Sequence, residues 1–226
     1  MLKSKINKKE QRLLKKNGFL HIRKFFPQDF LKKIFDKIKN NQKIFNSIRV
    51  MNPHRNMSVV KKLFKNNEIV NVVKFLLKTR KIHGLQSELF INPPYKSKGH
   101  PPHQDDFFLK TGVGNSLNFW IPLVNVNKKN GALVFYKNSH MRGINEKLNS
   151  DLLNQKKSRS NVLKKYTTET ISCKLGDVII ISNSIFHKSH NNLSKEKRVV
   201  IAYGYIKQGS SFVRGKTAKR IPIKVG

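Results

Sequence analysis

Short apolar runs separated by turn residues fill the chain after Gly84, and this rhythm constrains the fold more than any other feature. The runs cover residues 85–91, 107–109, 117–126, 132–136, 167–174, 177–182 and 198–206. Short strands that follow one another predict a sandwich or a barrel. A double-sheet jelly roll is one way to pack about eight such strands. We therefore expect a mainly β, cupin-like fold with flanking helices.

The amino-terminal part has a different pattern, which is typical of helices. Apolar positions recur at helical spacing in residues 27–39 and 59–79. Residues 7–16 form a shorter predicted helix that ends at an Asn-Gly pair, and residues 19–22 form a predicted strand. We expect these helices to cover an outer face of the sheets.

The chain has 226 residues, of which 38% are hydrophobic, so it can build one proper core. We expect a single domain over residues 1–226. It comprises a helical part at about 1–84, a jelly-roll core at about 85–206 and a basic tail at 207–226. Residues 141–165 are polar and basic and interrupt the strands. We expect them to form a long loop that is either a mobile lid or disordered.

The formal net charge of +35 is extreme. Clustered basic residues favour nucleic-acid binding, because each contact neutralises a phosphate. The 37 lysines far outnumber the 10 arginines, however, and they are scattered along the chain. Arginine is the better residue for planar, bidentate recognition. We favour a generally basic surface that attracts acidic substrates and anionic surfaces, and keep nucleic-acid binding as an alternative.

The sequence also bears on location. No apolar run approaches the roughly 20 residues that span a bilayer. The start of the chain, residues 1–12, is charged and lacks the apolar stretch of a signal peptide. Cys173 is the only cysteine, so no intramolecular disulfide can form, and we expect it to be a small core residue. These features predict a cytoplasmic protein.

Two histidines and a carboxylate stand out as candidate metal ligands. His103 and Asp105 flank Gln104, and His187 follows His103 by 84 residues. On a strand, alternate side chains point to the same side, so His103 and Asp105 would face inward together. Imidazole and carboxylate groups on one triangular face suit non-haem Fe(II) and leave the opposite face open. A single cysteine excludes an all-cysteine zinc site.

Several neighbours of these residues leave alternatives open. Alternation favours Asp105 over the adjacent Asp106, but spacing alone does not separate His187 from His190. Arg198 lies 11 residues after His187 and could hold the carboxylate of a cosubstrate. The alternative for Arg198 is an ordinary charge at a strand edge.

Several motifs resemble the phytanoyl-CoA dioxygenase family of iron(II)/2-oxoglutarate oxygenases, over a stretch from about Leu89 to Ile206. The motifs are Leu89–Pro94, Pro102–Asp105, Trp120–Leu123, Asn130–Leu133, and the stretch from His187 through Asn192 to Arg198. Residues 138–140 resemble the family's Pro-Gly-Ser-His motif, but without its Pro-Gly. The segment 17–20 is also similar to the family's amino-terminal segment.

The resemblance implies a double-stranded β-helix that uses Fe(II), 2-oxoglutarate and O2. The implied iron ligands are His103, Asp105 and His187, and the residues implied to contact 2-oxoglutarate are Arg198, Ser189, Trp120 and Leu89. His187 is preferred to His190 because Arg198 then falls at the family's spacing. Related members that halogenate lack the carboxylate ligand, so the presence of Asp105 implies hydroxylation.

The expected substrate is a small-molecule or lipid-like compound, anionic ones included, with 2-oxoglutarate decarboxylated to succinate. Two alternatives remain. One is a basic jelly-roll module that binds nucleic acid or anionic surfaces without chemistry, and the other is an oxygenase that acts on a macromolecule. Asn118 lies on the same side of its predicted strand as Trp120 and could touch cosubstrate or substrate.

Overall fold

The computed structural model describes residues 6–95, 97–154 and 161–226. The helices are α1 (Lys8–Asn17), α2 (Gln28–Lys39), α3 (Gln42–Phe45), α4 (Ser58–Phe64), α5 (Asn67–Leu77), α6 (Asp105–Leu109) and α7 (Glu146–Leu153), with the short 3-10 helices η1 (Pro53–Arg55), η2 (Ser139–Arg142) and η3 (Asn161–Lys165). The strands are β1 (Phe19–Ile22), β2 (Arg49–Met51), β3 (Ile82–Asn92), β4 (Ser116–Pro122), β5 (Leu133–Tyr136), β6 (Thr168–Ile171), β7 (Val178–Ser182), β8 (His187–Ser189), β9 (Arg198–Lys207) and β10 (Ile223–Lys224).

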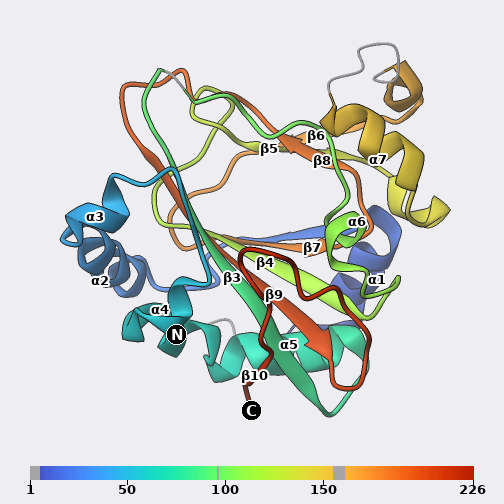
Figure 1. Ribbon diagram of the computed structural model, residues 1–226, viewed down its shortest axis with the longest axis horizontal. Helices are drawn as coiled ribbons and strands as arrows, with labels where there is room; N and C mark the ends of the chain where they lie inside the picture. Colours follow the sequence, from blue (N-terminus) through green and yellow to red (C-terminus); the bar gives the residue numbers. More distant parts are fainter. Residues whose placement is uncertain (1–5, 96, 155–160) are drawn as a thin grey trace.

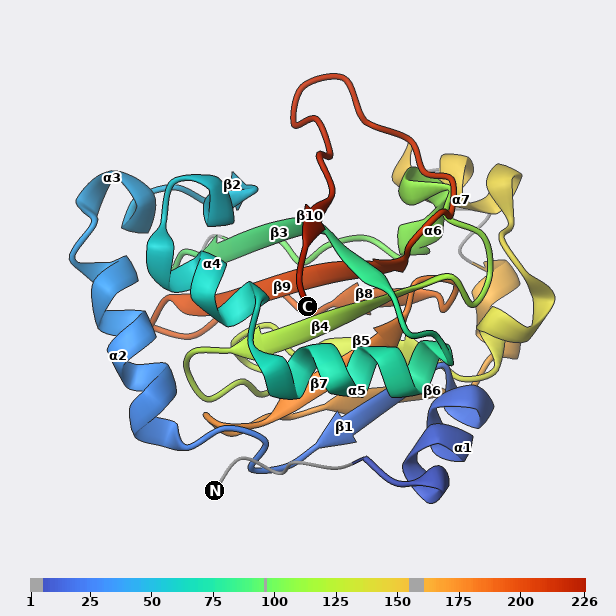
Figure 2. The ribbon, with the colours of Figure 1, turned by 90° about the horizontal axis from the view of Figure 1, so that it is seen from below.

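Two antiparallel sheets face each other across a shared core, as Figures 1 and 2 show. The larger sheet has the order β1-β7-β4-β9-β3-β10, with β2 paired to β3, and the smaller has the order β6-β5-β8. Apolar residues of both sheets, among them Trp120, Phe135 and Val200, form one buried cluster between them. The predicted mainly β jelly-roll fold is confirmed.

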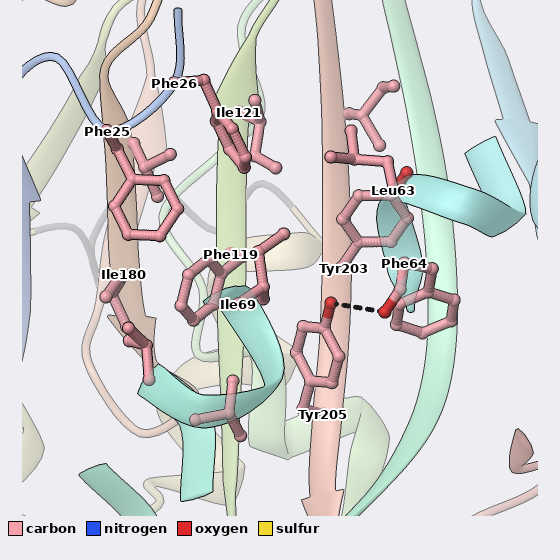
Figure 3. Packing of buried hydrophobic residues seen from close by; sticks show 14 of the residues in the cluster. Phe25, Phe26, Leu63, Phe64, Ile69, Phe119, Ile121, Ile180, Tyr203 and Tyr205 are labelled. Atoms are coloured by element: carbon pink, nitrogen blue, oxygen red, sulfur yellow. Dashed lines mark hydrogen bonds between the residues drawn. The ribbon is translucent and has the colours of Figure 1, made fainter. Parts of the chain in front are cut away.

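Helices α2, α4 and α5 cover the outer face of the larger sheet, as predicted (Figure 2). Figure 3 shows how closely they pack: the ring of Phe64 on α4 stacks on Tyr203 of β9 at a centroid distance of 4.6 Å. A Cβ atom at Gly84 would lie 2.6 Å from that ring, so glycine is needed at this position of β3. This packing fixes the strands whose inner faces carry the candidate site.

Replacing Tyr205 by phenylalanine should lower the free energy of unfolding by about 1–2 kcal/mol. The buried Tyr205 hydroxyl donates to the carbonyl oxygen of Phe64 at 3.0 Å (Figure 3), and its loss leaves that oxygen without this partner. Urea unfolding measures the change. Tyr95→Phe is the matched control, since Tyr95 is 66% exposed. Equal effects of the two substitutions would contradict the prediction.

Three local predictions are corrected. Residues 107–109 lie in helix α6 rather than in a strand, because a run of three apolar residues has no readable period and two aspartates in the first turn favour a helix start. The single helix predicted at 59–79 is divided into α4 and α5, since the Asn66 side chain accepts from the backbone N–H groups of residues 68 and 69 and starts a new helix.

The third correction concerns the predicted loop at 141–165. It contains helix α7 and the short helix η3, while residues 155–160 lie outside the described residues, so the predicted lid or disorder is tested only in part. Two strands that lie outside the expected jelly-roll core belong to the larger sheet. Strand β1 pairs with β7, and β10, near the end of the basic tail, pairs with β3. Within the described ranges, no helix combines the length and apolar character that crossing a bilayer requires.

Candidate metal centre

His103 and His187 stand side by side because their backbones are paired. The two residues form an isolated antiparallel bridge, in which each N–H donates to the other's carbonyl at 3.0 Å. Asp105 follows at the start of α6. One ligand atom from each of the three side chains lies within 4.8 Å of the others. His103 Nε2 and His187 Nε2 lie 3.5 and 3.9 Å from Asp105 Oδ1.

Backbone carbonyls orient both imidazole rings. His103 Nδ1 lies 2.8 Å from the carbonyl oxygen of Pro101, and His187 Nδ1 lies 3.1 Å from that of Ile185. A carbonyl only accepts, so each Nδ1 carries the proton and each Nε2 offers its lone pair to the centre. Metal-bound histidines are commonly held by hydrogen bonds of this kind.

Asp105 is held in the ionised state that a metal needs. Asn118 Nδ2 donates to Asp105 Oδ2 at 2.6 Å, which leaves Oδ1 directed at the two histidines. Burial favours the neutral acid, but the neighbouring His187 and His103 outweigh it and hold the pKa of Asp105 well below its usual range. Burial lowers the pKa of His187 to about 4, although the Asp105 carboxylate opposes the shift. A neutral imidazole and a carboxylate are the forms that bind a metal ion.

The structure places the alternative ligands, Asp106 and His190, away from the candidate centre. The carboxylate of Asp106 accepts from the backbone N–H groups of Thr111 and Gly112, so it holds the turn after α6. The ring of His190 lies 3.3 Å from the Thr170 hydroxyl and does not line the cavity at the three ligands. Asp105 and His187 are therefore the members of each pair that meet His103.

Gln104 points away from the metal ligands, as alternation predicts, and fastens their segment to the fold. Its fully buried amide donates to the carbonyl oxygens of Gly143 and Ser184. Its oxygen accepts from the backbone of Asn145 and from the side chain of Asn149 on α7. The segment after β5 is thus tied to the metal-ligand motif by three hydrogen bonds to one side chain, and a fourth reaches Ser184 after β7.

Gln104→Ala should therefore lower the free energy of unfolding by about 3 kcal/mol, since several buried polar partners lose their hydrogen bonds at once. Urea unfolding of the metal-free protein measures the change. Gln208→Ala serves as the control, because Gln208 is exposed and its side chain forms no hydrogen bond within the described ranges. A loss no larger than that of the control would show that the network contributes little.

Arg198 is a buried cation that has no counter-ion among the residues the structure describes. Its side chain is 2% exposed, and burial lowers its pKa to about 10. Nη1 donates to the carbonyl oxygen of Gly131 at 2.8 Å and Nη2 to Asn92 Oδ1 at 2.6 Å, while Nε has no hydrogen-bond partner in the described part of the chain. No carboxylate of the described residues forms an ion pair with it. A buried charge of this kind is costly unless an anion pairs with it, so the group suits the carboxylate of a ligand.

Of the three other residues expected to contact the cosubstrate, two line the cavity and one does not. Ser189 and Trp120 line the same cavity as Arg198, whose guanidinium lies 5.8 Å from the Trp120 ring. Ser189 Oγ accepts from the backbone N–H of His100 at 2.9 Å, which leaves its own hydrogen free to donate to a ligand. Leu89 does not reach the site: it is fully buried in the cluster under the helices, because its side chain leaves the opposite face of β3.

The three ligands and Arg198 share a cavity of about 320 Å³. Its walls include residues that the sequence reasoning missed, namely Arg49, Gln86, Glu88 and Arg220. A signal existed for Glu88, which is the only charged residue in the stretch 84–92 and is directed to the same side as Gln86 and Phe90. Arg220 offered no local signal, since it comes from the basic tail.

A second group of potential metal ligands has a structural explanation. His21, Cys173 and Asp177 lie together, but the Asp177 carboxylate already accepts from His21 Nε2 and from the backbone N–H groups of Lys24 and Lys174. Burial raises the pKa of the Cys173 thiol to about 12, so it stays protonated, whereas the thiolate is the form that binds metals. This cluster stabilises the turn before β7.

The candidate centre fits both groups that the sequence resemblance implies. Its donor set matches the imidazole and carboxylate preference of ferrous iron. The unpartnered Nε of Arg198 gives a direct place for a carboxylate oxygen in the same cavity.

Comparison with known proteins agrees with this geometry. The family model "Phytanoyl-CoA dioxygenase (PhyH)" matches residues 14–200. Phytanoyl-CoA dioxygenase 1 of Oryza sativa subsp. japonica is 30% identical over 100 residues, which cover 43% of this chain and only 35% of that relative.

Solved structures share the fold. The α-ketoglutarate-dependent carbocyclase SnoK from nogalamycin biosynthesis superposes with a TM-score of 0.80 at 15% identity, covering 100% of this chain and 97% of its own. EctD from S. alaskensis with 2-oxoglutarate and 5-hydroxyectoine superposes with a TM-score of 0.75 at 17% identity, covering 92% and 78%. The family match extends over most of the chain and includes all three candidate ligands, so the chain belongs to the phytanoyl-CoA dioxygenase family.

Proposed function

We propose that the protein is an Fe(II)- and 2-oxoglutarate-dependent oxygenase that hydroxylates an unactivated C–H bond of a small-molecule or lipid-like substrate. In the balanced reaction, substrate, 2-oxoglutarate and O2 give hydroxylated substrate, succinate and CO2. One observation carries the proposal: three side chains with metal-ligand geometry share a cavity with the buried Arg198, which forms no ion pair with a carboxylate of the described residues.

The chain's own residues have distinct roles in this proposal. His103, Asp105 and His187 hold the iron, and Asn118 fixes the rotation of the Asp105 carboxylate through its 2.6 Å hydrogen bond. When bound there, iron with 2-oxoglutarate and O2 supplies the oxidation of the C–H bond. Arg198 orients the cosubstrate by binding its distal carboxylate.

Two further residues complete the cosubstrate pocket in this reading. The hydroxyl of Ser189 donates to the same carboxylate, because its oxygen is already turned toward the N–H of His100. Trp120 is 5% exposed and forms an apolar wall beside Arg198, which keeps water away from the ion pair. A pairing shielded from water binds more strongly than one in solvent.

The direct test is an anaerobic titration of the Fe(II)-loaded protein with 2-oxoglutarate. A weak visible charge-transfer band should appear and saturate, and admission of O2 should yield succinate. The matched control is 2-oxopentanoate, which keeps the keto-acid end but lacks the distal carboxylate. It should need a much higher concentration, because Arg198 has nothing to bind. A protein that binds Fe(II) but gives no band with 2-oxoglutarate would contradict the proposal.

A further inference from the structure

The basic tail runs across the open side of the cavity. In Figure 1 the dark red segment after β9 passes in front of the larger sheet and returns to β3. Val213 N donates to the carbonyl oxygen of Leu109 on α6 at 2.8 Å, and Asn52 Nδ2 donates to that of Lys219 at 3.4 Å. The segment 208–222 is therefore anchored to α6 and to Asn52.

This segment brings Arg220 into the cavity lining. Arg220 Nε donates to Gln86 Oε1 at 2.6 Å, and Nη1 donates to the carbonyl oxygen of Val213 at 2.6 Å. Both acceptors are neutral, and Arg220 forms no ion pair with any carboxylate in the described part of the chain. Burial lowers the pKa of Arg220, while the Glu88 and Asp105 carboxylates oppose that shift. Arg220 and the three metal ligands line the same cavity.

The carboxylate of Glu88, which also lines the cavity, already has hydrogen-bond partners for both of its oxygens. Glu88 is 8% exposed, and its Oε2 accepts from Arg49 Nε at 2.8 Å and from a second nitrogen of the same guanidinium. Its Oε1 accepts from Gln86 Nε2 at 2.8 Å. The charges of Arg49 and Glu88 therefore cancel, and the charge of Arg220 remains in excess.

Apolar side chains also line the cavity. Met51, Phe108 and Leu109 line it, and the ring of Phe108 lies 6.1 Å from that of His103 between centroids. Phe108 is 41% exposed, so its ring is accessible to a ligand. One cavity thus brings together a cation, apolar side chains and the metal ligands.

We propose that Arg220 binds an anionic group of the primary substrate, a carboxylate or a phosphate, and that the tail segment 208–222 thereby selects acids with an apolar body. The inference rests on the proposed function, whose substrate class it names. It is separate from the role of Arg198, which serves the cosubstrate. The excess positive charge of the whole chain, +35, adds long-range attraction for such substrates.

Calorimetric titration under nitrogen, with Fe(II) and saturating 2-oxoglutarate present, tests the inference on the wild-type protein. The probes are 3-phenylpropanoate, 3-phenylpropanamide and 2-phenylethyl phosphate, which differ in the charged group but keep the phenyl body. At least one anion should bind about 10-fold or more tightly than the amide, as one charge-assisted contact allows. The carboxylate and phosphate arms show which anion fits. Equal affinities for both anions and the amide overturn the proposal.

Variants then test whether a preference for the anion over the amide depends on Arg220. Arg220→Gln should abolish the preference for the anion and leave the affinity for the amide unchanged, whereas Arg220→Lys should retain part of it. Lys216→Gln removes the same charge from an exposed position of the same segment and should retain the full preference. An Arg220→Gln protein that still prefers the anion overturns the proposal. The wild-type comparison does not depend on how any variant folds.

The charge-transfer band separates this inference from the proposed function. Arg220→Gln should give the same 2-oxoglutarate band as the wild type, because Arg198 and the metal ligands are untouched. A band without any anion preference would remove the inference and leave the proposed function standing. The opposite result is also informative. If the wild type gave no 2-oxoglutarate band but preferred the anion, and Arg220→Gln lost that preference, the Arg220 site would stand and the oxygenase proposal would fall.

Discussion

Replacing His187 by alanine is expected to lower 2-oxoglutarate-dependent turnover by more than about 100-fold, since the loss of groups that merely support a ligand already costs 10–100-fold. His187 is buried with its Nε2 directed at Asp105, so the substitution leaves two ligands where three are needed. Fe(II) affinity, measured anaerobically, should fall in parallel. Succinate formation and iron titration together separate a lost ligand from a lost substrate contact.

His190→Ala is the matched control for this experiment. His190 lies three residues along the same segment, with its ring near Thr170 and outside the cavity lining. Its replacement should leave iron affinity and turnover at the wild-type level. The reverse pattern, with His190 essential and His187 dispensable, would remove His187 from the proposed iron shell. Thermal unfolding of both variants shows whether either change acts through the fold.

Arg198→Ala is expected to weaken 2-oxoglutarate binding by about 30- to 4,000-fold, the equivalent of the 2–5 kcal/mol typical of losing one partner of a buried charge pair. The guanidinium of Arg198 is buried, and its Nε is unpartnered in the described structure, so the distal carboxylate has no substitute there. Titration of the charge-transfer band measures the affinity.

The analogue 2-oxopentanoate makes this prediction specific. It lacks the distal carboxylate, so its affinity should be nearly the same in Arg198→Ala and in the wild type. Fe(II) affinity without cosubstrate should also be unchanged, because Arg198 is not among the candidate ligands. If the variant lost both keto acids equally, Arg198 would be supporting the cavity rather than binding the carboxylate. Arg198→Lys should recover part of the 2-oxoglutarate affinity.

The strands could be predicted because their signals are local. Alternation and turn residues mark residues 132–136 and 177–182, and the structure has β5 and β7 at these places. The prediction failed at α6 because its three apolar residues are too few to distinguish a strand from a helix. It also merged α4 and α5, since an internal helix start depends on one Asn66 side chain.

The candidate centre was predictable in its chemistry and only partly in its geometry. The types and spacing of His103, Asp105 and His187 pointed to ferrous iron, although Asp105 lies on a helix rather than on the expected strand. Leu89 was expected at the cosubstrate only through the family resemblance, but its side chain packs in the cluster under the helices, because alternate residues of β3 face opposite sides of the sheet. Arg220 was missed because its contact with Gln86 spans 134 residues of chain.

The backbone bridge between His103 and His187 bears on how the metal centre takes up iron. Two peptide hydrogen bonds, rather than the metal, set the separation of these imidazoles, so the apoprotein already presents them in a nearly finished arrangement. Slow hydrogen–deuterium exchange is therefore expected at both amides before any iron is added, with little further slowing afterwards. A scaffold of this kind can release its ion and reload it without refolding the surrounding strands.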